Sequence, residues 1–142
     1  EFQGLFGGKS SPVHFFWCAF DVALTRFSGA ANPEPPPDAV MGEAYSHAVI
    51  SHGCWCGGDW PAGGRFEDPL FYGYALPQPD GFEKEDIKPD YGTWSGDLGE
   101  YILPYSKVRV SETPEQDILH FLQTTYEAAA DRAGWDRKDL ER

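Results

Sequence analysis

Positively charged side chains are scarce in this sequence. Its 142 residues include 11 Lys and Arg against 23 Asp and Glu, which gives a formal net charge of -12 at pH 7. A chain with this charge repels the phosphate backbone of nucleic acids, and no cluster of basic residues offsets the average. The same repulsion applies to anionic membrane surfaces. The composition therefore predicts neither a nucleic-acid nor a membrane partner, and the acidic residues are expected on solvated loops and helix surface.

Long hydrophobic runs and a secretory leader are also missing. No window holds the roughly 18 consecutive apolar residues that a membrane-spanning helix needs. The N-terminus has no charged, apolar, small-residue leader. The cysteines are few and odd in number, at Cys18, Cys54 and Cys56, whereas a disulfide-stabilised secreted domain carries an even set. We therefore expect a reducing, cytoplasmic setting.

Aromatic residues are abundant, at 15% of the chain, and they concentrate in segments bounded by Gly and Pro. Such segments are typical of β-strands. Segment 13–27 is apolar on both alternating faces, which predicts one long bent strand or two, central in the sheet and covered on both sides. Further strands are expected at 44–51, 70–76 and 100–103. The last of these is expected near a sheet edge, because Pro104 cannot donate to a ladder.

One long helix is expected after the strands. Residues 113–116 supply an N-cap Thr, a Pro at the first helical position and a Gln placed to close a capping box. Gly134 is a natural C-terminal stop, and a short further turn is expected at Asp136. The spacings of three and four predict one buried stripe, formed by Ile118, Leu122, Thr125, Tyr126, Ala129 and Ala133. The order of elements predicts an α+β fold, a mostly antiparallel sheet of about four or more strands with one amphipathic C-terminal helix packed on it.

The length of the chain fits a single domain over residues 1–142. Within it, residues 30–38 are rich in proline and predict an extended connector. Residues 77–90 are expected to form an acidic loop. The first residue is Glu1 rather than Met, which indicates a chain processed or cut from a longer one.

Polar side chains interrupt the aromatic strands. His14, Asp21 and Arg26 lie in the first strand segment and His47 lies in the next. Asp21 and Arg26 are expected on opposite faces if the pleat is regular. Burying such a group without a partner costs on the order of 1–3 kcal/mol, so each needs a partner or a wet cavity.

Two interpretations of these polar residues stay open. An apolar cleft with a few convergent polar groups is typical of a site for a small organic ligand, and whether such a ligand is also a substrate is left open. A buried polar network can equally serve to fix a core. The ligand-binding hypothesis names His14, Asp21, Arg26, Tyr45, His47, Trp55 and Tyr72.

A transition-metal site is the alternative hypothesis, with His47, His52, Cys54 and Cys56 as ligands. These ligand types suit zinc. However, alternate residues of a strand lie roughly 6.5–7 Å apart, so His52, Cys54 and Cys56 cannot all reach one ion. The competing interpretation is that the small thiols pack beside Trp55 as buried hydrophobes. Zinc is the cofactor these residues would hold, and it is not favoured.

Ordered motifs run along most of the chain: SPVHFFW at 11–17, FD at 20–21, TRFSG at 25–29, YSH at 45–47, LGE at 98–100, LPY at 103–105, TYEAAA at 125–130 and AGWD at 133–136. Together they resemble an uncharacterised bacterial family that is known only as a domain of unknown function. The resemblance places among family motifs the ligand-site candidates His14, Asp21, Arg26, Tyr45 and His47.

The resemblance carries three further implications and no activity, cofactor or partner. The family pattern has no thiols matching Cys18, Cys54 or Cys56, which disfavours the metal site. It has Glu where this chain has Ala48, so an activity needing that carboxylate would be missing here. It also has a strand-rich part preceding these motifs, which implies that the chain is a C-terminal half. A third hypothesis follows, a structural half-domain whose sheet is completed by an N-terminal half or by a second copy in a homodimer.

Overall fold

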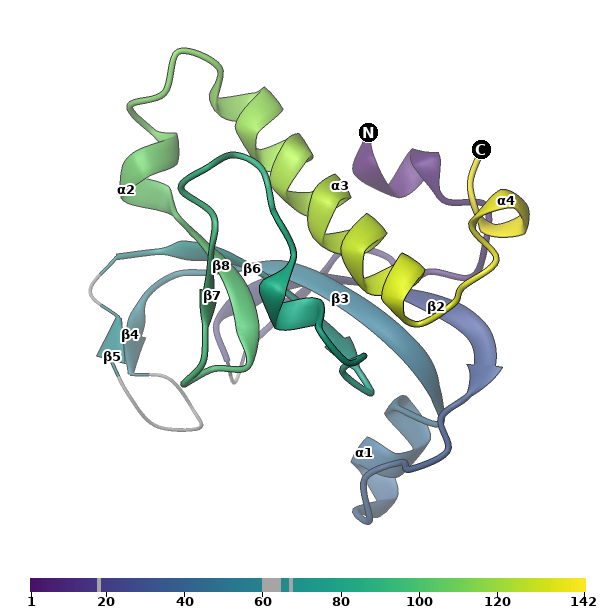
Figure 1. Cartoon of the computed structure of the whole chain (residues 1–142). Helices are drawn as coiled ribbons and strands as arrows, with labels where there is room; N and C mark the ends of the chain where they lie inside the picture. The colour runs from purple at the N-terminus through teal and green to yellow at the C-terminus, as the bar shows by residue number, and fades with distance from the viewer. Residues whose placement is uncertain (18, 60–64, 67) are drawn as a thin grey trace.

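An antiparallel sheet with a long helix across one face forms the architecture (Figure 1). The computed structural model describes residues 1–17, 19–59, 65–66 and 68–142. Within these residues, the main sheet has six strands in the order β1-β2-β3-β6-β8-β7, all pairs antiparallel. They are β1 (His14–Phe16), β2 (Asp21–Ala31), β3 (His47–Trp55), β6 (Leu70–Leu76), β7 (Thr93–Ser95) and β8 (Glu100–Pro104). The predicted α+β fold is confirmed.

The remaining elements are short except for one helix. β4 (Gly58–Asp59) and β5 (Arg65–Phe66) pair with each other outside the main sheet. The helices are η1 (Phe2–Leu5), α1 (Ala39–Ala44), η2 (Phe82–Lys84), α2 (Tyr105–Val108), α3 (Pro114–Arg132) and α4 (Arg137–Leu140), where η marks a 3-10 turn. None of the described helices is long and apolar enough to cross a membrane.

The aromatic segment 13–27 is a hairpin at the edge of the sheet. β1 pairs with β2, with Phe16 opposite Asp21, and the turn between them includes Phe20 at a φ of 55°. β1 ends the strand order, and Phe15 and Trp17 are 46% and 80% exposed. The expectation of a central strand covered on both sides is therefore wrong for β1. The alternating apolar residues of this segment therefore belong to an edge strand with exposed aromatic side chains.

The other strands lie close to their expected positions. β6 and β8 match the segments 70–76 and 100–103, and β8 lies next to the edge strand β7. β3 begins later than expected because residues 39–44 form α1 instead. That helix is capped by the Asp38 carboxylate, which accepts from the backbone N–H groups of Val40 and Met41.

Helix α3 begins at Pro114 and is followed by Gly134 in the left-handed region at a φ of +66°, as the sequence predicted. The expected capping box is wrong in detail, because the Thr113 side chain makes no capping hydrogen bond. The Asp117 carboxylate accepts instead from the hydroxyls of Ser111 and Tyr91, each at 2.5 Å. The buried stripe is also rotated slightly, to Phe121, Thr125, Tyr126, Ala129 and Ala130.

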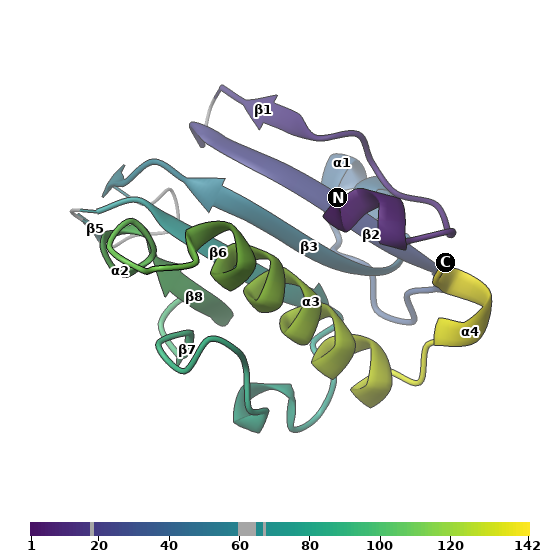
Figure 2. The same cartoon turned by 90° about the horizontal axis from the view of Figure 1, so that it is seen from above.

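Hydrophobic side chains cover both faces of the sheet. On the face under α3, called the helix face, the core includes Leu24, Ile50 and Leu103. Seen from above, η1 and α3 both lie over this face (Figure 2). The opposite face, called the far face, carries a second cluster, and Tyr74 and Ile102 pack against it. The members of that second cluster are Ala23, Trp55, Leu70 and Tyr72.

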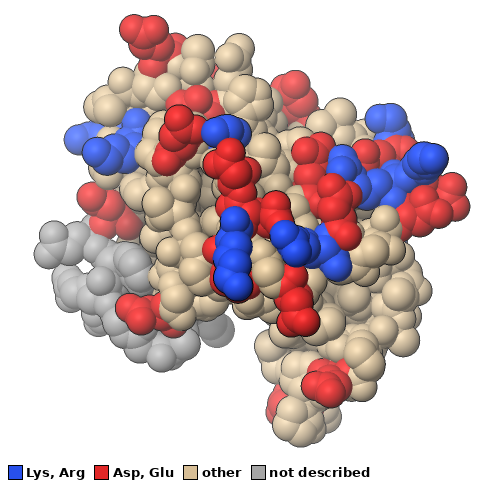
Figure 3. Space-filling model, in the orientation of Figure 1, with Lys and Arg blue, Asp and Glu red and all other residues tan. Residues whose placement is uncertain are grey.

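The two ends of the chain meet beside α3. Phe6 forms an antiparallel bridge with Glu141, and the Arg142 N–H donates to the Leu5 carbonyl at 3.0 Å. Acidic and basic side chains are interspersed over the helices and the segment between β6 and β7 (Figure 3). Arg137, for example, contacts Glu127 at 2.9 Å. Acidic side chains on this side of the molecule therefore form ion pairs with neighbouring basic side chains.

Candidate functional site

The far face brings together three of the predicted ligand-site residues, Asp21, Trp55 and Tyr72. Asp21 and Trp55 are cross-strand partners on β2 and β3, and the Tyr72 hydroxyl donates to Asp21 Oδ2 at 2.5 Å. This contact spans β3 because residue 53 is glycine. A Cβ there would lie 2.3 Å from Tyr72 Oη, closer than any real contact. The sequence thus leaves the space that the Tyr72–Asp21 hydrogen bond occupies.

A second hydrogen bond, between two tyrosine hydroxyls, lies beside the one from Tyr72 to Asp21. Tyr45, at the C-terminal end of α1, and Tyr74 on β6 share a hydrogen bond between their hydroxyls at 2.9 Å. The rings of Tyr72 and Tyr74 stack with centroids 6.1 Å apart. Burial raises the pKa of both Tyr72 and Tyr74 above the ordinary value, and for Tyr72 the hydrogen bond to Asp21 adds to that effect. Both hydroxyls therefore stay protonated and remain hydrogen-bond donors at physiological pH.

Glu100 completes the far-face site, and the sequence analysis did not include it. It lies at the start of β8, two positions from Ile102, which is opposite Tyr72. Strand alternation therefore puts the Glu100 side chain on the far face. Burial, followed by the negative charge of Asp21, raises the pKa of Glu100 to about 7. Its Oε2 atom is buried and has no hydrogen-bond partner.

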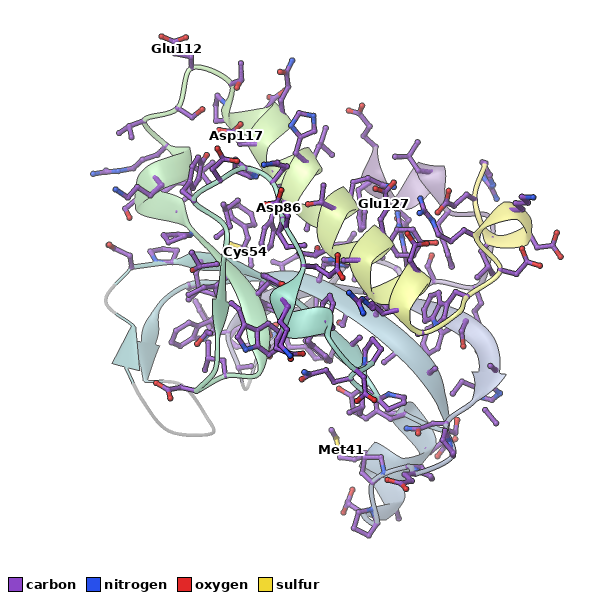
Figure 4. All side chains as sticks on the ribbon, in the orientation of Figure 1. Met41, Cys54, Asp86, Glu112, Asp117 and Glu127 are labelled. Atoms are coloured by element: carbon purple, nitrogen blue, oxygen red, sulfur yellow. The ribbon has the colours of Figure 1, made fainter. Side chains whose placement is uncertain are left out.

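A carboxyl with this pKa exists in both protonation states near neutral pH. The protonated form donates a hydrogen bond, and the ionised form accepts one or holds a cation. The sequence signal for Glu100 is weak, because whether a carboxylate such as Glu127 pairs with it depends on the fold. Glu127 lies on α3 (Figure 4), where it bonds to Arg137 at 2.9 Å and Gln123 at 2.8 Å. The charge that acts on Glu100 is that of Asp21 instead.

Arg26 lies on the helix face, opposite Asp21, as the regular pleat predicted. It is 1% exposed, and its Nη2 donates to the Phe2 carbonyl at 2.6 Å. The guanidinium carbon lies 3.6 Å from the Phe2 ring centroid and 4.3 Å from that of Tyr126. Burial lowers its pKa to about 10, so it keeps its charge. Arg26 thus fastens η1 to the sheet and does not reach the far-face site.

The two remaining histidine candidates are exposed and separate. His14 lies on the edge strand β1, where its ring meets that of Phe16 at 5.9 Å. His47 starts β3 and its Nδ1 lies 3.2 Å from the Ser46 hydroxyl. The structure therefore does not bring His14, Arg26 and His47 to one cavity.

The four proposed metal ligands are also dispersed. His47 is the first residue of β3 and His52 lies further along the same strand, where its Nε2 atom is 2.8 Å from Thr125 Oγ1. Cys54 is half-buried and Cys56 is exposed. Among the residues described by the structure, no three of His, Cys, Asp and Glu are grouped as metal ligands. The thiol of Cys18 lies outside the described residues.

Comparison with known proteins identifies the family. The family model of DUF5996, described as a family of unknown function, matches residues 1–142. The chain belongs to DUF5996. No curated protein and no solved structure matches it significantly. The resemblance to a family of unknown function is thus confirmed, and the match extends over the whole of this sequence. That the chain is the C-terminal half of a larger DUF5996 protein stays a prediction.

Proposed function

We propose that this DUF5996 chain binds a small organic ligand carrying an amino group, and that the ligand sits on the far face between Asp21, Glu100 and the aromatic rings. The observation that carries the proposal is Glu100. Its carboxyl group is buried where the negative charge of Asp21 acts on it, and its Oε2 has no partner. Native proteins satisfy most buried polar atoms, so an orphaned carboxyl oxygen favours a ligand that pairs with it.

The surrounding side chains support a cationic ligand. An ammonium group gains from two carboxylates and from the faces of aromatic rings, and Trp55, Tyr72 and Tyr74 belong to this hydrophobic cluster. The net charge of -12 raises the local concentration of cations around the molecule. Tyr74 and Glu100 are only partly buried, so a ligand reaches the site from their side.

The site also supports proton exchange with its ligand. A carboxyl that titrates near pH 7 can take a proton from a bound molecule and return it, which general acid–base catalysis requires. In this proposal Glu100 is the exchanging group. Asp21, whose carboxylate accepts from the Tyr72 hydroxyl, adds to the effect of burial in raising the pKa of Glu100.

Titration with benzylamine, benzyl alcohol and toluene, followed by NMR at pH 8, tests the proposal. We expect benzylamine to bind best and to perturb the far-face residues. Glu100→Gln should weaken benzylamine binding by about tenfold or more, since a tenfold change corresponds to about 1.4 kcal/mol. The matched control is Glu127→Gln on α3, which should bind as the unmodified chain does. Equal binding of the three probes, or of the two variants, would contradict the proposal.

The aromatic hairpin favours a second candidate function, self-association. β1 is the outermost strand, and residues 10–20 contain no charged side chain. Two copies can therefore pair their β1 edges without bringing like charges together. The exposed aromatics would be covered in such a homodimer.

Analytical ultracentrifugation of the chain and of Trp17→Lys tests this candidate. Trp17 is 80% exposed, so its replacement leaves the fold intact. We expect a dimer that Trp17→Lys converts to a monomer, whereas Val110→Lys, another exposed site, leaves the dimer unchanged. A monomeric chain at high concentration would contradict it.

A further inference from the structure

A cavity lies on the helix face, away from the far-face site. Its volume is about 290 Å³, and it lies between η1, β2, β3, β6 and α3. Its apolar wall includes Phe2, Val22, Leu24, Phe71 and Leu122, and His52 supplies a polar group. Val22 is 38% exposed, so the cavity opens to solvent beside the hairpin. Among the described lining residues, Glu1 alone is charged.

His52 is a neutral imidazole in this wall. It is 2% exposed. Burial, followed by the positive charge of Arg26, lowers the pKa of His52 to about 3. One ring nitrogen therefore carries a hydrogen and the other is a bare acceptor at physiological pH.

Hydrogen-bond geometry decides which nitrogen is the acceptor. Thr125 Oγ1 has one hydrogen, and the carbonyl of Phe121 at 2.7 Å accepts it. The same Oγ1 lies 2.8 Å from His52 Nε2. Thr125 must therefore accept from His52, which assigns the hydrogen to Nε2. Nδ1 is left as an acceptor, and it is buried without any hydrogen-bond partner.

The orientation of the ring places Nδ1 on the side of His52 that faces β2. A Cβ at Gly73 would lie 3.0 Å from His52 Cδ2, so the Cδ2 edge faces β6. Nδ1 is on the opposite edge of the ring, and the cross-strand neighbour of His52 on β2 is Leu24. Leu24 and His52 both line the cavity. Leaving a buried acceptor unpaired is costly, and a bound donor would remove that cost.

We propose that this cavity binds a small, uncharged, mostly apolar molecule whose one hydroxyl or N–H group donates to His52 Nδ1. The volume is at the lower end of the roughly 300–1,000 Å³ of typical ligand pockets, so a single ring with a hydroxyl, such as a phenol, is the class that fits. The absence of any basic residue from the described lining fits a neutral ligand rather than an anion.

Para-cresol and toluene are the probes, because they differ only in the hydroxyl group. The chain is labelled with ¹⁵N in its histidines, and the His52 nitrogens are followed by NMR during each titration. We expect para-cresol to shift Nδ1 toward the position of a hydrogen-bonded acceptor while Nε2 keeps its hydrogen. Toluene should bind about tenfold more weakly or more, since the donor is worth about 1.4 kcal/mol at that ratio, and should leave Nδ1 unshifted.

Three variants test the acceptor and separate this cavity from the far-face site. His52→Phe removes the acceptor and should abolish the preference for para-cresol over toluene. Leu122→Trp fills the cavity without touching the acceptor and should remove the binding of both probes. Glu100→Gln should bind para-cresol normally, and benzylamine should bind normally to Leu122→Trp, so the two proposals fail independently.

Three results would overturn the inference. Equal affinity for para-cresol and toluene would show that no donor is recognised. Binding of para-cresol with no shift of Nδ1 would place the ligand elsewhere. An Nδ1 that is already hydrogen-bonded in the free protein and unaltered by para-cresol would mean that water satisfies it permanently.

Discussion

Single residues set the geometry of the polar contacts on each face of the sheet, and two glycines illustrate how. Gly53 on β3 leaves room for the Tyr72 hydroxyl to reach Asp21. Gly73 on β6 leaves room for the contact between His52 and Thr125 on the helix face. In each case a polar contact occupies the space above a strand where the Cβ atom of any other residue would lie. These positions therefore depend on packing rather than on backbone conformation.

Gly53→Ala should destabilise the fold and disturb the site. Its Cβ would lie 2.3 Å from Tyr72 Oη and 2.4 Å from the Val22 carbonyl oxygen, and backbone cannot move as easily as a side chain. We expect a loss of about 1–3 kcal/mol in the free energy of unfolding, the range for overpacking, measured by urea denaturation. Gly96→Ala is the matched control, since a Cβ there meets nothing within 4 Å. Equal stabilities of the two variants would contradict the description of the site.

The buried His52 should make stability depend on pH. Its pKa is about 3 in the folded chain against 6.5 for an ordinary histidine, so below pH 6.5 the unfolded chain binds a proton that the folded chain does not. The contribution of His52 to stability should therefore fall as the pH decreases, by on the order of 2 kcal/mol between pH 7 and pH 5. Glu100 has the opposite effect, because a raised carboxyl pKa costs stability as the pH rises through about 7.

Comparison with His52→Gln separates the two groups. Gln keeps an N–H donor for Thr125 and does not titrate, whereas Glu100 contributes equally to both proteins. Urea denaturation at pH 5 and pH 7 should show that the change in the free energy of unfolding from pH 7 to pH 5 is less favourable in the unmodified chain than in His52→Gln, by the amount that His52 contributes. Parallel pH profiles would show that His52 is not buried in its neutral form.

At the scale of elements, the N-terminal turn η1 depends on the strand beneath it. Arg26 on β2 donates to the Phe2 carbonyl and lies against the rings of Phe2 and Tyr126. Arg26→Met keeps much of the volume but leaves the Phe2 carbonyl unpaired, which costs about 1–3 kcal/mol when the group stays buried. We expect faster amide hydrogen exchange in η1, with little change at the far face. The exposed Arg109→Met is the control, and unchanged exchange in η1 would contradict the role of Arg26.

The elements also differ in how far the sequence predicts them. Helix α3 begins and ends where Pro114 and Gly134 indicate, because helix ends are encoded by local residues. The exposed hairpin was not foreseen, because an apolar run does not distinguish a covered central strand from an exposed edge. The hydrogen bond from the Tyr91 hydroxyl to the Asp117 carboxylate joins residues that are distant in sequence, so local residues do not indicate it.

The candidate site was predictable only in its residue types. Asp21, Trp55 and Tyr72 were named from polar and aromatic residues on strands, but their assembly requires the register of β2, β3 and β6. Glu100 was missed because its raised pKa comes from burial and from Asp21 across the sheet. Local sequence contains neither piece of information.

At the scale of the whole molecule, one sheet separates two chemically different sites. The far face holds two carboxylates among aromatic rings, and the helix face holds a neutral acceptor in an apolar cavity. The sheet between them is antiparallel throughout its described strands, and the residues on its two faces alternate along each strand. We therefore expect substitutions at one site to leave ligand binding at the other unchanged.

The proposed function depends on one property of Glu100 on the far face, a pKa that burial and the charge of Asp21 raise to about 7, so that the carboxyl group exchanges protons near neutral pH. Its most direct test is the NMR titration of the Glu100 side-chain carboxyl carbon in the unmodified chain and in Asp21→Asn. We expect a pKa near 7 that falls only in part when the charge of Asp21 is removed, because burial is the larger cause of the shift, and that falls on addition of benzylamine. A Glu100 that titrates near 4.5 in both proteins and ignores the amine would contradict it.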